Sequence, residues 1–152
     1  MPDRFSNGDS NNDFIQGLRA GTDRTKPGLR HGGDFQGIIN HLDYLKELGV
    51  TAIWMTPVFI NDMPEIAGGY GDHVYGAYHG YAATDFYQTD PRFGTNQKYK
   101  ELVETAHEKG LKVVMDIIHN HSGDKHWWID DPPTSDWYNS CLLYTSDAAD
   151  EG

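Results

Sequence analysis

The sequence predicts an α/β fold with parallel strands, because one pattern of helix, glycine and apolar strand occurs twice along the chain. The first copy ends its helix at Gly49 and continues into the short apolar run of residues 52–55. The second copy ends its helix at Gly110 and continues into residues 112–118. Helices that alternate with buried strands are typical of parallel strands joined by right-handed crossovers, so we expect a parallel sheet.

Each helix is predicted from an apolar stripe at helical spacing. The stripe of the first helix consists of Ile38, Ile39, Leu42, Leu45 and Leu48. The stripe of the second helix consists of Tyr99, Leu102, Val103 and Ala106. Thr95 precedes the second helix and is a candidate N-cap, since its hydroxyl can accept a hydrogen bond from the first turn.

Residues 1–5 are expected to be the end of an earlier strand. A strand usually has about five or six residues, so only its last part fits at the start of this chain. With residues 52–55 and 112–118, this makes about three strands. A (β/α)8 barrel, or TIM barrel, needs about 250 residues, so this chain is predicted to hold part of one, strands one to three.

The composition indicates a packed core and excludes two kinds of partner. Hydrophobic residues make up 38% of the chain and aromatic residues 12%, which is typical of a globular domain. The net charge of −11 would repel a phosphate-coated partner, so no nucleic acid is expected. No apolar run approaches the roughly 20 residues of a spanning helix, so no membrane contact is expected. No signal segment follows Met1, and the compartment stays undetermined.

The last twelve residues, "CLLYTSDAADEG", differ from the rest of the chain in period and composition. They resemble the translation of a transposon-type sequencing adaptor, and the alternative is a short acidic tail. On the first reading, the natural sequence is cut near Ser140 and belongs to a longer protein. Cys141, the only cysteine, therefore says nothing about the redox compartment.

A long connection, residues 57–94, separates the first helix–strand pair from the second. Such long loops inside a compact domain are uncommon and usually functional. Its side chains include two histidines, His73 and His79, and five tyrosines: Tyr70, Tyr75, Tyr78, Tyr81 and Tyr87. A tyrosine ring can pack on the C–H groups of a sugar while nearby polar groups bind its hydroxyls. The alternative is that most of these rings are core, with only one or two touching a ligand.

Polar side chains follow the strand at residues 112–118, where parallel α/β folds place their chemistry. Asp116, Asn120 and His121 form the pattern DxxxNH. Taken alone this pattern is weak, because an aspartate can cap a loop and a single histidine is often structural. His119 and His121 could also bind zinc, but the sequence offers no convincing third ligand.

A second polar group lies near the start of the chain. Oxygen-only ligands without thiols select Ca²⁺ over transition metals. The alternative is an Asn/Asp/Gly-rich loop chosen for its turns. The candidate calcium ligands are Asn7, Asp9, Asn12, Asp13 and Asp34, with the carbonyl of Gly32.

Several segments together resemble the amino-terminal part of the catalytic barrel in the α-amylase family of glycoside hydrolases, family 13. The branch that they resemble is that of the neopullulanases and cyclomaltodextrinases, and the resemblance covers Met1 to about Asn139. The segments are "MPDRFSNGDSNND", "RHGGDFQGIINHLDYLKELGVTAIWMTPV", "YHGYAATDFYQTDPRFGT" and "GLKVVMDIIHNHSG".

The resemblance assigns a role to each candidate residue. His121 matches the histidine that hydrogen-bonds the sugar in the cleavage subsite, and Tyr81 matches the tyrosine on which that sugar stacks. Asp116 matches the aspartate that supports the site from beneath. Asn120 matches an asparagine that fixes the adjoining loop and is a calcium ligand in some relatives. The resemblance also implies a structural Ca²⁺ at the oxygen ligands of residues 7–34.

The resemblance implies an α-glucan substrate and retaining hydrolysis of α-1,4 or α-1,6 glucosidic bonds in starch, pullulan or cyclodextrins. The nucleophile, acid/base and stabilising carboxylates would follow strands four, five and seven, so we assign no catalytic residue here. We therefore expect this polypeptide alone to be inactive and poorly folded. The alternatives are a transglycosylase of the same family, a non-catalytic carbohydrate-binding protein, and a zinc hydrolase.

The predicted organisation has three parts. Residues 1–121 are the barrel part, residues 122–140 begin a small inserted domain, and residues 141–152 are the adaptor translation. Trp127, Trp128 and Trp137 either line a cleft or pack the insert. In the whole protein, the resemblance also allows a homodimer.

Overall fold

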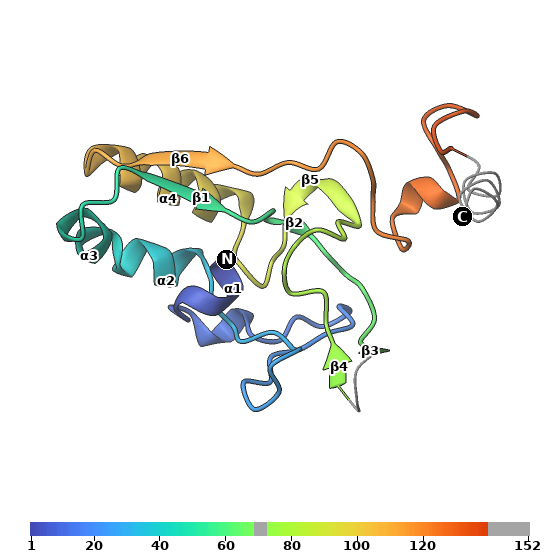
Figure 1. Ribbon diagram of the computed structural model, residues 1–152, viewed down its shortest axis with the longest axis horizontal. Helices are drawn as coiled ribbons and strands as arrows, with labels where there is room; N and C mark the ends of the chain where they lie inside the picture. The colour runs from blue at the N-terminus through green and yellow to red at the C-terminus, as the bar shows by residue number, and fades with distance from the viewer. Residues whose placement is uncertain (69–72, 140–152) are drawn as a thin grey trace, which may run out of the picture.

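A computed structural model describes residues 1–68 and 73–139 of the chain. Tyr70 and the predicted adaptor segment, residues 141–152, lie outside the described residues. The centre of the fold is a pair of parallel strands, β1 (Ala52–Met55) and β6 (Lys112–Met115), which run side by side in Figure 1. Their register pairs Ala52 with Lys112 and Met55 with Met115. The predicted parallel pairing is therefore confirmed.

The strand predicted over residues 112–118 is too long. It ends at Met115, because its next partners would be Thr56 and Pro57 in the β1 register, and Pro57 has no N–H for the ladder. The strands were also predicted to be buried, and this is wrong for most of their residues. Trp54 is 72% exposed, and Val114 and Met115 are each 42% exposed.

The predicted first helix is divided in two, α2 (Phe35–Asn40) and α3 (Leu42–Glu47). The division falls at His41, whose φ of −115° and ψ of 12° lie outside the helical range. The His41 ring nitrogen Nδ1 lies 2.7 Å from the carbonyl of Gly37, which holds the side chain against α2.

The second helix, α4 (Asn96–Glu108), begins as predicted at Thr95, whose hydroxyl accepts a hydrogen bond from Lys98 N at 3.1 Å. Gly49 and Gly110 follow α3 and α4 with φ values of +86° and +80°, which glycine adopts without strain. Both predicted stop signals are therefore confirmed.

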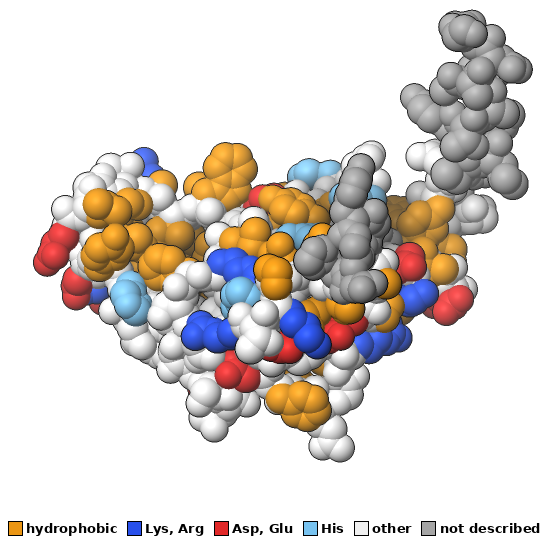
Figure 2. All heavy atoms as spheres, turned by 60° about the horizontal axis from the view of Figure 1, so that its bottom comes forward, with side chains coloured by type: hydrophobic (Ala, Val, Ile, Leu, Met, Phe, Trp, Pro, Cys, Tyr) orange, Lys and Arg blue, Asp and Glu red, His pale blue; other side chains and the backbone are white. Residues whose placement is uncertain are grey.

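The core lies between the helices and one face of the β1–β6 pair. Its buried members come from α2, α3, α4, β1 and the connections. They are Phe35, Ile38, Leu42, Met55, Val58, Phe93, Leu102, Ala106 and Leu111. Other hydrophobic side chains reach the surface, and Figure 2 shows a group of them at the end of the molecule that carries α2 and α3.

Residues 1–5 do not form the end of a strand. Pro2–Phe5 is a single helical turn, α1, in which proline occupies the first turn, where its missing N–H costs nothing. The buried carboxylate of Asp3 accepts hydrogen bonds from His31 N at 3.0 and 3.1 Å. The turn is therefore fixed by a side chain and not by pairing with β1.

The long connection contains short antiparallel elements. β2 (Phe59–Ile60) pairs with β5 (Asp85–Thr89), and β3 (Ile66–Gly68) pairs with β4 (His73–Tyr75). Two short 3-10 helices, η1 (Ser10–Asn12) and η2 (Trp127–Ile129), complete the described elements. None of the helices in the described part of the chain has the length and apolar character to cross a membrane.

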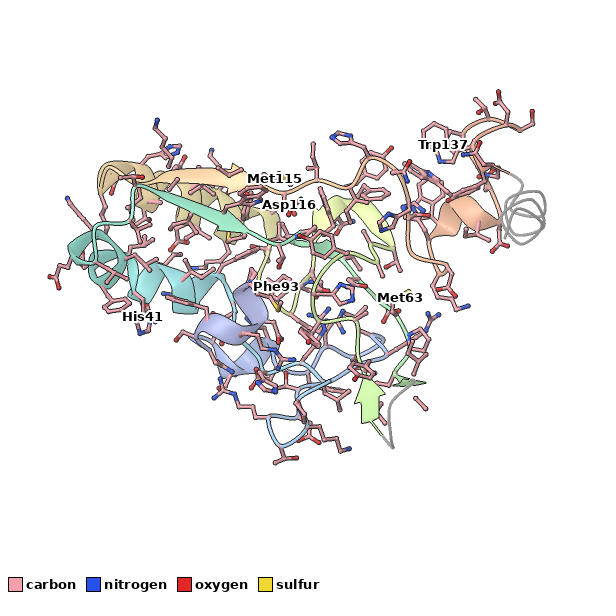
Figure 3. The ribbon with its side chains drawn as sticks, viewed as in Figure 1. His41, Met63, Phe93, Met115, Asp116 and Trp137 are labelled. Atoms are coloured by element: carbon pink, nitrogen blue, oxygen red, sulfur yellow. The ribbon has the colours of Figure 1, made fainter. Side chains whose placement is uncertain are left out.

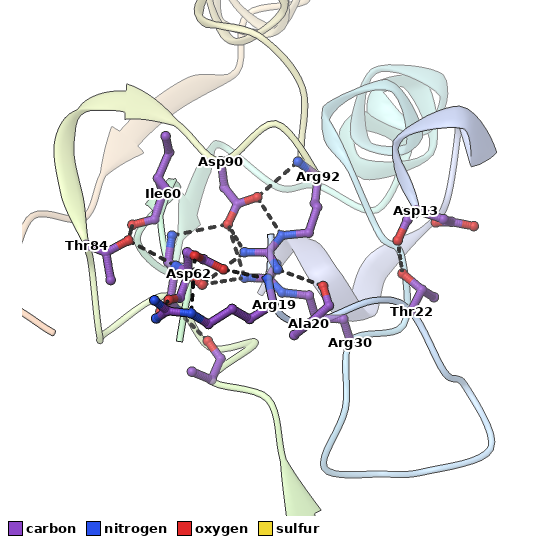
Figure 4. A network of polar contacts seen from close by, with 12 residues as sticks. Asp13, Arg19, Ala20, Thr22, Arg30, Ile60, Asp62, Thr84, Asp90 and Arg92 are labelled. Atoms are coloured by element: carbon purple, nitrogen blue, oxygen red, sulfur yellow. Dashed lines mark hydrogen bonds and ion pairs between the residues drawn. The ribbon is translucent and has the colours of Figure 1, made fainter. Parts of the chain in front are cut away.

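A buried ionic cluster joins the connection to the residues that precede α2 (Figure 4). The carboxylate of Asp90 accepts hydrogen bonds from Arg92 at 2.7 and 2.8 Å and from Arg30 at 3.1 Å. The three side chains are 0–3% exposed. Burial alone would raise the pKa of Asp90, but the charges and hydrogen bonds of Arg30 and Arg92 outweigh it and lower that pKa. The sequence did not reveal this cluster.

We expect Asp90→Ala to destabilise the fold by about 3–5 kcal/mol, because it leaves two buried guanidinium groups without their counter-ion. Urea unfolding of the whole protein that contains this chain, followed by tryptophan fluorescence, measures the change. Glu104→Ala is the control, since Glu104 forms only an exposed ion pair with Lys100 on α4, where a loss of about 0.3–0.5 kcal/mol is expected. Equal losses in the two variants would show that the cluster is not essential to the fold.

Candidate functional site

The three predicted substrate-binding residues form one hydrogen-bonded chain. The hydroxyl of Tyr81 donates to Asp116 Oδ2 at 2.8 Å, and His121 Nε2 lies 2.7 Å from the backbone carbonyl of Tyr81. Because a carbonyl only accepts, Nε2 donates in this hydrogen bond, and the Nδ1 of a neutral ring is left as an acceptor. Figure 3 shows Asp116 just beyond Met115, where β6 ends. The structure thus brings Tyr81, Asp116 and His121 together at the carboxyl end of a parallel strand.

Tyr81 presents part of its ring to solvent. The residue is 40% exposed, and the imidazole of His79 stacks on its ring with centroids 5.9 Å apart and planes 25° apart. The hydrogen bond to Asp116 raises the pKa of the Tyr81 hydroxyl above its usual value of 10.0. The hydroxyl therefore stays protonated at neutral pH and keeps donating to Asp116.

The turn before Tyr81 requires a neutral histidine at position 79 and a glycine at position 80. His79 Nδ1 accepts the backbone N–H of Tyr81 at 3.0 Å, which requires a neutral imidazole, and burial lowers the pKa of His79. Gly80 has a φ of +89°, and a Cβ there would lie 2.1 Å from the carbonyl oxygen of Pro57. The "YHGY" segment was noted in the sequence, but only Tyr81 was singled out, and these roles of His79 and Gly80 were missed.

The expectation that most tyrosines of the long connection are core is wrong for the four that the structure describes. Tyr75 is 41% and Tyr87 70% exposed, in addition to Tyr81. Tyr78 is half-buried, and the guanidinium of Arg4 lies 3.8 Å from its ring centroid. These rings form a surface and not an interior.

A cavity of about 530 Å³ lies beside His121. The predicted residues Asn120 and His119 line it together with aromatic rings. Trp128 and Trp137 also line it, with their ring centroids 5.1 Å apart, so these two rings both face the cavity and pack on each other. The remaining lining residues are Phe59, Phe86, Tyr87, Ile117, Ile118, Ser122 and Tyr138.

The candidate calcium ligands of the amino-terminal loop are only partly brought together. Asn7 Nδ2 lies 2.7 Å from Asp13 Oδ1, and a Cβ added at Gly32 would lie 2.3 Å from that same oxygen. Asn7, Asp13 and Gly32 therefore converge. The carboxylate of Asp9 faces Asn11 instead, accepting hydrogen bonds at 2.8 and 3.1 Å.

Asp34 holds the same loop in place through hydrogen bonds to its carboxylate. It is fully buried, caps α2 through Gly37 N at 2.6 Å, and accepts the backbone N–H groups of Gly8 and Asp9 at 2.8–3.1 Å. Its second oxygen also lies 3.4 Å from Asn12 Nδ2. Asp34 therefore has a structural role whether or not a metal binds.

Two features of the loop fit a cation. Asn12 Oδ1 is buried and has no hydrogen-bond partner among the described residues. Burial raises the pKa of Asp13, and the charges of Asp34 and Asp9 add to this, while the hydrogen bond from Asn7 and the charge of Arg24 oppose it. Asn120 lies apart from this loop, in the wall of the aromatic cavity. Within residues 1–68 and 73–139, no group of three or more His, Cys, Asp or Glu side chains is placed to hold a metal ion.

The fold and the site together define a class of protein. Parallel α/β strands with an exposed tyrosine, a carboxylate and a histidine at their carboxyl end, beside an aromatic cavity, are typical of sites for polyhydroxylated ligands. Residues 1–147 match the family model described as "Alpha amylase, catalytic domain". The chain belongs to the α-amylase family.

Individual relatives agree with this assignment. The chain is 47% identical over 125 residues to the beta/alpha-amylase of Paenibacillus polymyxa, covering 82% of this chain and 9% of the relative. It is 39% identical over 123 residues to a cyclomaltodextrinase of Thermoanaerobacter pseudethanolicus, covering 81% and 19%. The alpha-amylase of Geobacillus thermoleovorans, solved with acarbose, superimposes with a TM-score of 0.72 at 41% identity, covering 92% of this chain and 26% of that one.

These matches confirm the resemblance found in the sequence, and a neopullulanase is also among the relatives. The chain spans only 9% to 19% of the length of the two curated relatives described. The activity of the whole protein is therefore inferred below and not read from these names.

We expect Asp116→Asn to lower the pKa of the Tyr81 hydroxyl toward its ordinary value near 10.0, because an amide accepts the hydrogen bond less strongly than a carboxylate. NMR titration of ¹³C-labelled tyrosine measures this pKa, with the Tyr81 signal assigned from its loss in Tyr81→Phe. Asp124→Asn, an exposed aspartate beyond the site, serves as the control. An unchanged pKa in Asp116→Asn would show that the two side chains do not interact.

Proposed function

We propose that this chain is the amino-terminal part of the catalytic (β/α)8 barrel of an α-glucan hydrolase. The observation that carries the proposal is the hydrogen-bonded chain of Tyr81, Asp116 and His121 at the end of β6 in a member of this family. The substrate class is starch, pullulan or cyclodextrin, with α-1,4 or α-1,6 glucosidic bonds. The acarbose bound to the related Geobacillus enzyme supports this substrate class.

Each residue contributes to binding in a different way. The exposed ring of Tyr81 packs on the C–H face of a glucose unit, since a sugar ring and an aromatic ring both present flat apolar surface. His121 Nδ1 is free to accept a hydrogen bond from a sugar hydroxyl, while Nε2 stays on the Tyr81 carbonyl. Asp116 fixes the direction of the Tyr81 ring and does not attack the sugar.

The cleavage itself needs residues beyond this chain. Retaining hydrolysis uses a nucleophilic carboxylate and a second carboxyl group that acts first as acid and then as base. The resemblance places both after later strands of the barrel. The described residues therefore bind and orient the sugar, and we propose that they do not break the bond.

The exposed strand faces support the proposal that the chain alone is inactive. Trp54, Val114 and Met115 leave apolar surface open on β1 and β6, and both strands have an edge without a partner among the described residues. Such edges and faces favour aggregation. In the whole protein, further strands would cover them. The homodimer that the resemblance allows is likewise a proposal for the whole protein.

The direct test is hydrolysis of maltooligosaccharides by the whole protein that contains this chain, in wild-type form and as Tyr81→Ala and Tyr81→Phe. We expect Tyr81→Ala to lower kcat/KM about tenfold to a hundredfold, because it removes about 1.5–3 kcal/mol of apolar contact. Tyr81→Phe keeps the ring and is expected to stay within about tenfold of the wild type. No activity in the wild type, or hydrolysis by residues 1–152 alone, would contradict the proposal.

We also propose a structural Ca²⁺ at the amino-terminal loop. Asn7, Asp13 and the Gly32 carbonyl would hold it, with Asn12 Oδ1 as a buried acceptor beside them. Asp9 would have to turn from Asn11, and Asp34 would support the loop. Bound Ca²⁺ would add positive charge beside the carboxylates of Asp13 and Asp9.

The calcium proposal predicts that the melting temperature of the whole protein rises with added Ca²⁺ and falls with a chelator. A ligand present at 100 times its Kd stabilises by about 2.7 kcal/mol. Asp13→Asn should remove most of this response. Asp23→Asn is the matched control, because the Asp23 carboxylate lies outside the loop cluster and bonds only to Thr25 and Lys26. A Ca²⁺ response that Asp13→Asn leaves intact would place the ion elsewhere.

A further inference from the structure

The side chain of Asn61 links the buried ionic cluster to the turn that carries Tyr81. Asn61 follows β2 and is 1% exposed. Its backbone N–H donates to Asp90 Oδ2 at 3.2 Å, and its carbonyl accepts from Arg92 Nη2 at 2.9 Å. The buried ionic cluster thus binds both backbone groups of Asn61, and these two hydrogen bonds fix the position of its backbone.

The side-chain amide of Asn61 donates a short hydrogen bond to the carbonyl of Ala77. Ala77 has a φ of +41° and is the only non-glycine residue with a positive φ in the described part of the chain. This conformation is unfavourable for an L-residue and persists only where surrounding contacts hold it. The Asn61 amide is such a contact.

Ala77 begins the turn that ends at Tyr81. Its carbonyl also accepts the N–H of Gly80 at 3.3 Å, which closes the turn. Gly80 packs closely on the Pro57 carbonyl, where a Cβ would not fit, and the next residue is Tyr81. A change at Ala77 therefore redirects the backbone from which the Tyr81 ring projects.

We propose that Asn61 is a positioning residue, which holds the Ala77–Tyr81 turn so that the Tyr81 ring faces the sugar and its hydroxyl reaches Asp116. The assignment of a sugar as the ligand rests on the proposed function. The positioning of Tyr81 does not, because it follows from contacts among residues of this chain. Neither Asn61 nor Ala77 touches the sugar on this account.

Asparagine supplies the donor that the Ala77 carbonyl accepts, while its Oδ1 is buried without a partner among the described residues. An alanine leaves the Ala77 carbonyl, which is half-buried, with one donor fewer. An aspartate fills the same volume but, when ionised, offers no donor to Ala77. The backbone at this position bonds to the Asp90 carboxylate and to the guanidinium groups of Arg92 and Arg30, so charges of both signs act on it. When protonated, the aspartate can donate again, so its effect depends on pH.

The test compares Asn61→Ala and Asn61→Asp with wild type in the whole protein. Two quantities are measured, the pKa of the Tyr81 hydroxyl by ¹³C-tyrosine NMR and the Kd for maltotriose by calorimetry. In Asn61→Ala we expect the pKa of Tyr81 to move toward its ordinary value, as the bond to Asp116 is lost, and the Kd to rise about tenfold. In Asn61→Asp we expect the same weakening at high pH and recovery of maltotriose binding as the pH falls. If Asn61→Ala does not fold, Asn61→Asp decides, since it preserves the packing volume.

The control is Asn96→Ala, which removes an asparagine that caps a neighbouring segment by accepting hydrogen bonds from Thr89 at 2.8 and 3.0 Å. It should lower stability without moving the pKa of Tyr81. If the Asn61 variants match this control in both quantities, the proposal is overturned. If the wild type binds no maltotriose, the proposed function fails, while the pKa of Tyr81 still decides whether Asn61 positions it.

Discussion

The carboxylate of Asp90 is the interaction on which the arrangement of the long connection depends. Arg30, Arg92 and the backbone of Asn61 all bond to it, and each comes from a different segment of the chain. Two nitrogens of Arg30, Nε and Nη1, are buried without partners among the described residues, while its Nη2 donates to Asp90 at 3.1 Å and to the carbonyl of Asn61 at 3.5 Å. A buried charge that loses its counter-ion costs several kcal/mol, and this cost favours one geometry of the connection. The cluster acts together with the buried apolar residues of the connection, Val58, Phe59, Ala83 and Phe93.

The same cluster explains how an irregular segment can carry a binding site. Binding residues often lie on loops that a rigid scaffold positions. Here the parallel strand pair supplies Asp116, and the cluster supplies the turn that carries Tyr81, through Asn61 and Ala77. The two supports meet at the hydrogen bond between Tyr81 and Asp116. The direction of the ring therefore depends on both the regular and the irregular parts of the fold.

The sequence predicted the features that repeat or that have a local chemical signature. The predictions of Thr95 as a helix N-cap and of Gly49 and Gly110 as helix ends were correct. A cap and a residue with positive φ depend only on residues close to them in the sequence. The parallel pairing followed from the repeated order of elements. Tyr81, Asp116 and His121 were identified by their positions in known motifs, and the structure brings them together.

Where a feature depends on contacts between residues far apart in the chain, the sequence analysis either made no prediction or made a wrong one. Arg30 and Asp90 are far apart in the chain, and the sequence analysis singled out neither of them. The strand ended early because of Pro57 on its neighbour, and residues 1–5 formed a helical turn because Asp3 bonds to His31. The unexpected exposure of Trp54 has the same origin, since burial depends on which elements cover a strand and not on its own residues.

A crystal structure of the whole protein with bound maltotriose would test the central claim most directly. The account predicts a glucose ring against the exposed face of Tyr81, a sugar hydroxyl on His121, and an intact contact from Asn61 to Ala77. A sugar bound elsewhere, with the Tyr81 ring covered by other parts of the protein, would contradict it.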